Sequence, residues 1–160
     1  MRVCFVCLGN ICRSPAAEAV FVRLATDAGL DVEVDSAGTS SYNTGRPPHP
    51  ATLAEASRRG ISIDHVARQF TPADFATHDL VVVMDAANRR EVVRLAPDDA
   101  ARAKIVTMRS FAPDLGDPDA DIPDPYGLAA DAYVQMFDLL DASCRGLVAH
   151  VADLVARPSR

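Results

Sequence analysis

Short apolar runs, and one stretch in which Val32 and Val34 alternate with acidic residues, predict the strands of this chain. We expect four strands, over residues 3–7, 32–38, 80–84 and 104–108. The strongest signal is the run LVVVM at 80–84, because five consecutive apolar residues bounded by polar ones are typical of a strand buried on both faces.

Apolar residues at helical spacing lie between these runs. They predict helices over 15–28, 51–59, 86–95 and 129–156, and Thr71-Pro72 marks the start of a further one. Ser14 is expected to cap the first helix, with Pro15 at the first helical position, where its missing N–H costs nothing. Asp85 is expected to cap the helix that begins at 86. Loops rich in turn-forming residues occupy 39–50 and 113–125.

Alternating strands and helices favour a parallel sheet with helices on both faces. The predicted fold class is therefore α/β, with three layers in the order α/β/α. Residues 1–160 contain no repeat, low-complexity tract or linker, so we expect one domain.

Composition and charge exclude some classes of binding partner. The 160 residues are 49% apolar and 24% charged, which is typical of a globular protein rather than a disordered or fibrous one. The formal charge of −6 disfavours binding to nucleic-acid backbone. No apolar run approaches the roughly 18 residues of a membrane span, and the opening apolar stretch is too short for a signal peptide.

The cysteines point to a reducing compartment. Cys4, Cys7 and Cys12 lie close together and Cys144 stands alone, which does not resemble a secreted disulfide framework. We therefore expect a cytoplasmic location, although export without a signal peptide stays open. In a reducing cytoplasm a reactive thiol is more often catalytic or redox-sensing than structural.

The loop that follows the first strand carries the chemistry. It reads Cys7-Leu8-Gly9-Asn10-Ile11-Cys12-Arg13-Ser14 and joins a strand end to a helix start. This position binds ligands in open α/β sheets, and the helix start presents free N–H groups to an anion. Gly and Asn most readily adopt left-handed backbone angles, so the loop can turn its N–H groups inward as a nest for phosphate.

Two side chains complete this phosphate site. The planar guanidinium of Arg13 can hold two phosphate oxygens, and together with the inward dipoles it would stabilise a thiolate at Cys7. Ser14 could donate a hydrogen bond to the sulfur. The loop would therefore bind a dianion directly above a nucleophile.

Other ligand sites fit less well. The loop lacks the Gly-x4-Gly-Lys pattern of a nucleotide-binding Walker loop. A zinc site made from Cys4, Cys7 and Cys12 has no second ligand pair. The alternating aspartates at 117, 119 and 121 lack the Gly and Glu of an EF-hand, since Ile122 and Leu128 stand in those places. No metal or organic cofactor is implied.

Nine residues, Cys7 to Pro15, resemble the signature of the low-molecular-weight protein tyrosine phosphatases. The likeness continues through DSAGT at 35–39, GRPP at 45–48, HVARQ at 65–69, Met84-Asp85 and Asp124-Pro125-Tyr126, and so covers nearly the whole chain. It implies a four-stranded parallel sheet in the order 2-1-3-4, with the phosphate loop after strand 1. It also implies hydrolysis of phosphotyrosine and small aryl phosphates through a phosphocysteine intermediate.

The resemblance also assigns roles. Cys7 is the implied nucleophile, residues 8–14 bind phosphate with Arg13, and Asp124 is the general acid and then the general base. Pro125 favours an extended backbone at Asp124, which could hold its carboxyl out from the loop. Asp85 matches a family position near the loop, although a helix cap explains it equally well.

Surrounding residues complete the implied site. Tyr42 and Tyr126 match aromatic walls of the substrate pocket, but Gly127 stands where some members carry a second Tyr. Ser36 and His65 match positions that hydrogen-bond the loop asparagine, here Asn10. Cys12 matches the partner of a reversible disulfide with Cys7 that protects the thiolate. Implied partners are tyrosine-phosphorylated proteins, including a bacterial-type tyrosine kinase, with phosphate and other oxyanions as inhibitors.

Two other function classes share this loop. Arsenate reductases of the same fold need further cysteines as a relay, and this chain has none between Cys12 and Cys144. A non-catalytic phosphotyrosine-binding module would not need Cys7, Arg13 and Asp124 together. Phosphotyrosine hydrolysis is therefore the leading hypothesis.

Overall fold

A parallel sheet of four strands forms the centre of the molecule, whose computed structural model describes residues 1–156. The strands are β1 (Arg2–Cys7), β2 (Glu33–Gly38), β3 (Leu80–Val83) and β4 (Ile105–Thr107). Their order across the sheet is β2-β1-β3-β4, and each neighbouring pair is parallel. The predicted sheet and strand order are therefore confirmed.

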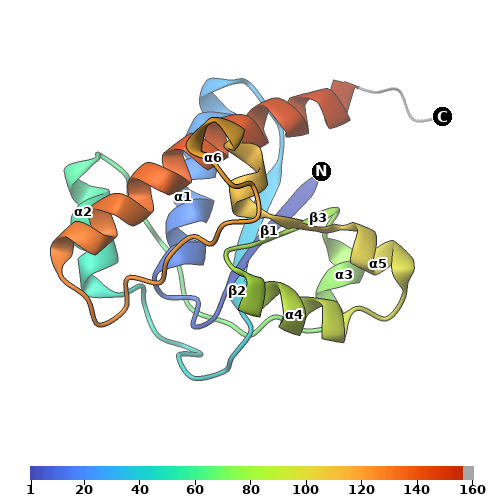
Figure 1. Cartoon of the computed structure of the whole chain (residues 1–160), viewed down its shortest axis with the longest axis horizontal. Helices are drawn as coiled ribbons and strands as arrows, with labels where there is room; N and C mark the ends of the chain where they lie inside the picture. The colour runs from blue at the N-terminus through green and yellow to red at the C-terminus, as the bar shows by residue number, and fades with distance from the viewer. Residues whose placement is uncertain (157–160) are drawn as a thin grey trace.

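Helices cover both faces of this sheet (Figure 1). One face is covered by α1 (Arg13–Asp27), α2 (Pro50–Arg58) and α6 (Ala130–Ala156), and the other by α3 (Asp74–Thr77), α4 (Ala86–Leu95) and α5 (Asp99–Ala103). The long helix α6 packs along α1. This arrangement is the predicted three-layer α/β/α architecture.

The sheet separates two hydrophobic cores. Val3 and Phe5 of β1 face the core shared with α1 and α6, whereas Cys4 and Val6 face the core shared with α3, α4 and α5. All four side chains are fully buried. Burial on both faces explains why β1 reads as a continuous apolar run instead of an alternating one.

The predicted cap of α1 is wrong. The helix begins at Arg13, its N-cap is Cys12, and no side chain caps it. Ser14 is the second helical residue and Pro15 the third, and the Ser14 hydroxyl is engaged in the preceding loop instead. Pro15 remains tolerated because N–H groups in the first helical turn have no partner within the helix.

Strand β4, the helix after Thr71-Pro72 and one additional helix also differ from the prediction. Strand β4 covers only Ile105–Thr107, since the chain turns at its end into a 3-10 helix, η1 (Met108–Phe111). The helix expected from Thr71-Pro72 begins at Asp74, whose carboxylate accepts the Thr71 N–H. The short helix α5 was not predicted. It begins where the Asp98 carboxylate accepts the Ala101 N–H, a cap that the sequence analysis did not consider.

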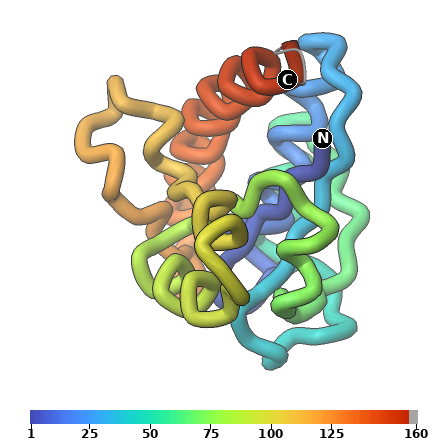
Figure 2. The backbone as a smooth tube through the Cα atoms, turned by 90° about the vertical axis from the view of Figure 1, so that its right-hand side faces the viewer, coloured from blue at the N-terminus to red at the C-terminus, as the bar shows by residue number. Residues whose placement is uncertain are grey.

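Helix α6 approaches the segment after β4 very closely. A Cβ atom at Gly146 would lie only 1.9 Å from the Phe111 carbonyl oxygen, so no larger residue fits there. After η1 and the short helix η2 (Pro113–Leu115), the chain forms an exposed loop that stands out from the body of the molecule in yellow and orange (Figure 2). This loop leads to Asp124.

Within residues 1–156, no helix combines the length and the apolar character that crossing a bilayer requires.

Candidate active site

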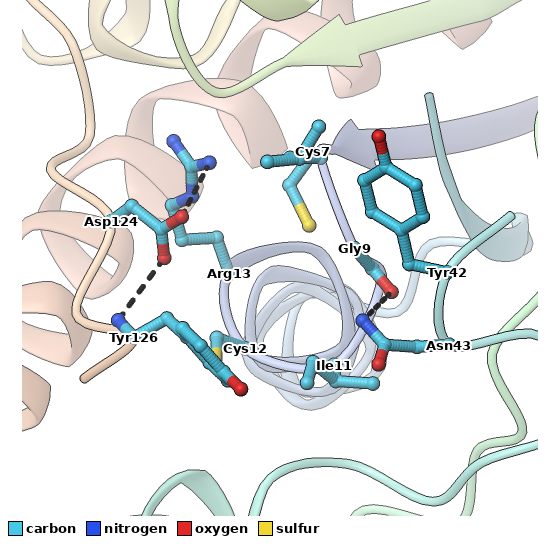
Figure 3. A pocket seen from close by; sticks show the side chains of 10 residues that line it. Cys7, Gly9, Ile11, Cys12, Arg13, Tyr42, Asn43, Asp124 and Tyr126 are labelled. Atoms are coloured by element: carbon cyan, nitrogen blue, oxygen red, sulfur yellow. Dashed lines mark hydrogen bonds and ion pairs between the residues drawn. The ribbon is translucent and has the colours of Figure 1, made fainter. Parts of the chain in front are cut away.

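A pocket opens where β1 ends and the loop of residues 8–12 leads into α1 (Figure 3). Three segments supply its lining: the loop after β1, the loop after β2 and the segment before α6. The lining residues are Cys7, Leu8, Gly9, Ile11, Cys12, Arg13, Tyr42, Asn43, Asp124 and Tyr126. Of the residues singled out from sequence, Asn10, Ser14, Ser36 and His65 lie behind this surface and contact the loop from the protein side.

The loop carbonyls are bonded away from the pocket. Four of them accept a hydrogen bond from a later segment: Cys7 from the Thr39 N–H at 2.8 Å, Leu8 from the Ser40 N–H at 3.0 Å, Gly9 from the Asn43 amide at 3.3 Å and Ile11 from the His49 N–H at 2.8 Å. Two neighbouring segments, the β2 end with its loop and the start of α2, therefore set the orientation of the loop backbone.

This orientation turns the loop N–H groups inward. In a trans peptide the C=O of one residue and the N–H of the next point in opposite directions, and no described peptide is cis. The N–H groups of residues 8, 9, 10 and 12 are thus directed to the inside of the ring. The Asn10 N–H lies 3.3 Å from the Cys7 sulfur, as this argument requires. Successive inward N–H groups form a nest for an anion.

Glycine permits the close contact between this loop and β2. A Cβ atom at Gly38 would lie 2.7 Å from the Leu8 carbonyl oxygen and 3.2 Å from Asn10. A side chain there would push the loop off the sheet end. The sequence analysis placed Gly38 at a strand end but gave it no role in the site.

Asn10 holds the turn in the loop. It has a φ of 56°, the one positive value among the described non-glycine residues, and its side chain is fully buried. Its amide donates to the hydroxyls of Ser14 (2.8 Å) and Ser36 (3.1 Å). Its side-chain oxygen accepts from the main-chain N–H of Arg68 (2.9 Å) and from Nε2 of His65 (2.8 Å). Four hydrogen bonds offset the strain of a left-handed residue.

These contacts continue to Glu18, which the sequence analysis missed. The Ser36 hydroxyl donates to the Glu18 carboxylate at 2.6 Å, and the same oxygen lies 3.5 Å from Nδ1 of His65. Burial raises the pKa of the Glu18 carboxyl above its usual range. Because the Asn10 oxygen can only accept, Nε2 of His65 carries a proton. No local pattern marks Glu18, which reads as an ordinary polar position on α1.

The Cys7 sulfur lies inside the ring and points into the pocket (Figure 3). It is 3.0 Å from the Ser14 hydroxyl and 3.3 Å from the Asn10 N–H. Since the Ser14 oxygen already accepts from the Asn10 amide, its own hydrogen can point to the sulfur at 3.0 Å or to the Ala37 carbonyl oxygen at 3.4 Å. The Asn10 N–H and the Ser14 hydroxyl are thus both placed to donate to the sulfur.

Arg13 is buried beside this sulfur with acidic partners. Its guanidinium contacts Asp85 at 2.6 Å and Asp124 at 3.5 Å and donates to the Ile122 carbonyl at 3.0 Å. Burial alone would lower the pKa of the guanidinium, but the negative charges of Cys7, Asp85 and Asp124 outweigh it and raise that pKa. Arg13 is therefore a fixed cation.

Asp85 has both of the roles considered from sequence, as a helix cap and as a residue beside the phosphate loop. One carboxylate oxygen accepts the Asn88 N–H and caps α4, while the other contacts Arg13. The start of α4 and the guanidinium are thus held by the same side chain.

Asp124 faces the sulfur from across the pocket. Its side chain is 41% exposed, so it can exchange protons with water, and it accepts the Tyr126 N–H at 3.2 Å. Tyr42 and Tyr126 flank the opening and are 80% and 64% exposed. Asn43, which the sequence analysis also missed, completes the wall beside Tyr42 (Figure 3).

The remaining thiols differ from Cys7. Cys12 lines the pocket but is buried, and this burial raises the pKa of its thiol to about 11. Burial raises the pKa of the Cys4 and Cys144 thiols further, and both side chains are fully buried in the cores. Neither Cys4 nor Cys144 lines the pocket.

Two substitutions of Asn10 separate the effect of its left-handed backbone from the effect of its side-chain hydrogen bonds. Asn10→Gly tolerates the left-handed backbone but leaves the buried partners of the amide unsatisfied, at a cost of about 2–3 kcal/mol. Asn10→Ala adds a further cost of about 1 kcal/mol, because a residue with a Cβ is strained at positive φ. Urea unfolding measures both. If the two variants are equally stable, the positive φ of residue 10 causes no strain. If Asn10→Gly is as stable as wild type, the side-chain hydrogen bonds of Asn10 do not stabilise the fold.

Known proteins share this sequence and geometry. A model of the family described as low molecular weight phosphotyrosine protein phosphatase matches residues 2–157. A low molecular weight protein-tyrosine-phosphatase of Streptomyces coelicolor is 45% identical over 96% of this chain and 95% of that protein.

Solved structures agree with these sequence matches. A protein tyrosine phosphatase of Entamoeba histolytica with Hepes in its active site has a TM-score of 0.91 at 32% identity, over 97% of this chain and 99% of that one. Vibrio vulnificus Wzb in complex with benzylphosphonate has a TM-score of 0.80 at 29% identity, over 93% of this chain and 97% of that one. With the cysteine-centred loop at the end of its first strand, this chain belongs to the low molecular weight phosphotyrosine protein phosphatase family.

Proposed function

We propose that this chain hydrolyses phosphotyrosine in two steps through a phosphocysteine at Cys7. The observation that carries the proposal is the position of the Cys7 sulfur, at the floor of a pocket and inside a ring of inward N–H groups. In the first step the thiolate attacks phosphorus, the S–P bond forms and the bond from phosphorus to the tyrosyl oxygen breaks. Asp124 gives its proton to that oxygen, because a phenolate is a poor leaving group.

The second step releases phosphate. Asp124, now ionised, takes a proton from the attacking water, the new P–O bond forms and the S–P bond breaks. The electron pair returns to the sulfur, where the Ser14 hydroxyl can hydrogen-bond the departing thiolate. The loop N–H groups and Arg13 stabilise the charge on the phosphoryl oxygens in both steps.

Tyr42 and Tyr126 are proposed to hold the substrate ring between them. Both line the pocket, and their exposure leaves their faces free to stack. The complex of the similar protein Vibrio vulnificus Wzb with benzylphosphonate supports a ligand that carries an aryl group next to phosphorus. We propose a tyrosine-phosphorylated protein as substrate, with a bacterial-type tyrosine kinase as a candidate. We further propose that the chain acts as one domain in the cytoplasm, a compartment that keeps Cys7 reduced.

Replacing the nucleophile should abolish turnover without unfolding the protein. Cys7→Ser removes the thiolate, and an alcohol in the same place is scarcely ionised at neutral pH. We expect release of phosphate from 4-nitrophenyl phosphate and phosphotyrosine peptides to fall by at least about 1,000-fold. Thermal unfolding should stay close to wild type, and Cys12→Ser should retain turnover as the matched control. Residual activity of Cys7→Ser near that of wild type would refute the proposal.

Substrates with different leaving groups test whether Asp124 donates a proton. Asp124→Ala should lower kcat/KM for phenyl phosphate by about 100-fold, because an unassisted phenolate must then leave. The loss for 4-nitrophenyl phosphate should be about tenfold smaller, since nitrophenolate needs less protonation. Asp119→Ala, an exposed aspartate on the same loop, should change neither value. Equal losses with both substrates would exclude proton donation by Asp124.

We propose that Cys12 protects Cys7 against peroxide. The Cys7 thiolate would reduce peroxide to water and become a sulfenic acid, which Cys12 would convert to a disulfide with loss of a second water. The buried position of Cys12 next to the loop supports this pairing, and its raised pKa keeps it a thiol until then.

Recovery after oxidation tests this protection. Wild type treated with peroxide and then dithiothreitol should regain most of its activity, whereas Cys12→Ser should lose it irreversibly as Cys7 is over-oxidised. Mass spectrometry distinguishes the disulfide from sulfinic acid. Equal recovery of both proteins would show that Cys12 gives no protection.

A further inference from the structure

His49 lies where three parts of the site meet. Its main-chain N–H donates to the Ile11 carbonyl of the phosphate loop at 2.8 Å. Its Nδ1 accepts the Ala51 N–H at 3.1 Å and thereby caps α2. The sequence analysis attached no site role to this residue.

The His49 ring also contacts two tyrosines. It stacks on the buried Tyr133 with ring centres 5.5 Å apart, and the Tyr133 hydroxyl lies 3.3 Å from Nδ1 and 4.0 Å from the Cys12 sulfur. It meets the pocket wall Tyr126 edge to face, with centres 5.7 Å apart and an interplanar angle of 79°. The imidazole is thus packed between a core residue and an exposed one.

The two walls of the pocket are held differently. Among the aromatic contacts of residues 1–156, Tyr126 makes one, with His49, and Tyr42 makes none. Tyr126 is 64% exposed, so few other neighbours restrain its ring. The same residue binds the Asp124 carboxylate through its N–H. A contact that fixes Tyr126 therefore also bears on the proton donor.

We propose that His49 is a positioning residue that holds Tyr126 as the fixed wall for the aryl ring of the substrate. His49 acts through Tyr126 and need not touch the substrate itself. The proposal rests on the proposed function, because it assumes that an aryl phosphate occupies the pocket. It predicts that His49 matters for the aryl group and not for the phosphoryl group, which the loop and Arg13 bind.

Two substitutions separate this role from the helix cap. His49→Asn keeps an oxygen that can accept the Ala51 N–H but removes the ring. His49→Phe keeps a ring between Tyr133 and Tyr126 but removes the acceptor. Both retain the main-chain hydrogen bond to Ile11. If His49 only stabilises the fold, the variant that unfolds at the lower temperature should also bind ligand more weakly. The proposal predicts instead that His49→Asn loses affinity and His49→Phe loses stability.

Binding by calorimetry is the decisive measurement, with benzylphosphonate and inorganic phosphate as probes. His49→Asn should weaken benzylphosphonate by about three- to tenfold, the range expected for one aromatic contact, and leave phosphate unchanged. His49→Phe should bind both probes as wild type does but unfold about 2–4 °C lower, because its helix cap is lost. In a Tyr126→Ala background, His49→Asn should have no further effect on benzylphosphonate.

The outcomes are distinguishable. Unchanged benzylphosphonate affinity in His49→Asn overturns the inference, as does an equal loss for both probes or an additive loss in the Tyr126→Ala background. Because binding is measured instead of turnover, an inactive wild type that still binds both probes refutes the hydrolytic function alone. A wild type that binds neither probe refutes the phosphate site and this inference together.

Discussion

The outward bonding of the loop carbonyls is the constraint on which the site depends. Each carbonyl tied to a neighbouring segment turns the next N–H toward the inside of the ring, so the anion nest is a product of contacts made outside the pocket. The left-handed backbone of Asn10 closes the ring, and its buried side chain is anchored to elements from three parts of the chain. The capacity of the loop to bind an anion thus depends on hydrogen bonds made behind the loop.

Charge is balanced within the same small volume. The buried Arg13 guanidinium shares the pocket with the Cys7 sulfur, and Asp85 and Asp124 place negative charge beside it. The site holds more acidic than basic groups before a phosphate dianion arrives. Strong binding of that dianion therefore requires the N–H dipoles in addition to Arg13, which explains why the loop geometry is so heavily supported.

Much of this could be predicted from sequence. Two-sided burial made β1 and β3 recognisable as apolar runs, and the loop motif located the site at the end of β1. The Ser14 cap was wrong because its hydroxyl has a competing use at the sulfur, which helix propensity cannot reveal. Asn43 and Glu18 were missed because their roles arise from contacts 34 and 18 residues away along the chain. Such contacts exist only once the sheet order brings the segments together.

The steric fit between Gly146 and Phe111 has a consequence for how this enzyme family can diversify. It fixes one end of the stretch that precedes Asp124, the proposed acid, and the Ile122 main chain fixes the other end through Met84 and Arg13. The residues between these two anchors are largely exposed. Insertions and substitutions there can reshape the approach to the pocket without displacing Asp124, the proposed proton donor, so new recognition surfaces can evolve without rebuilding the phosphate loop.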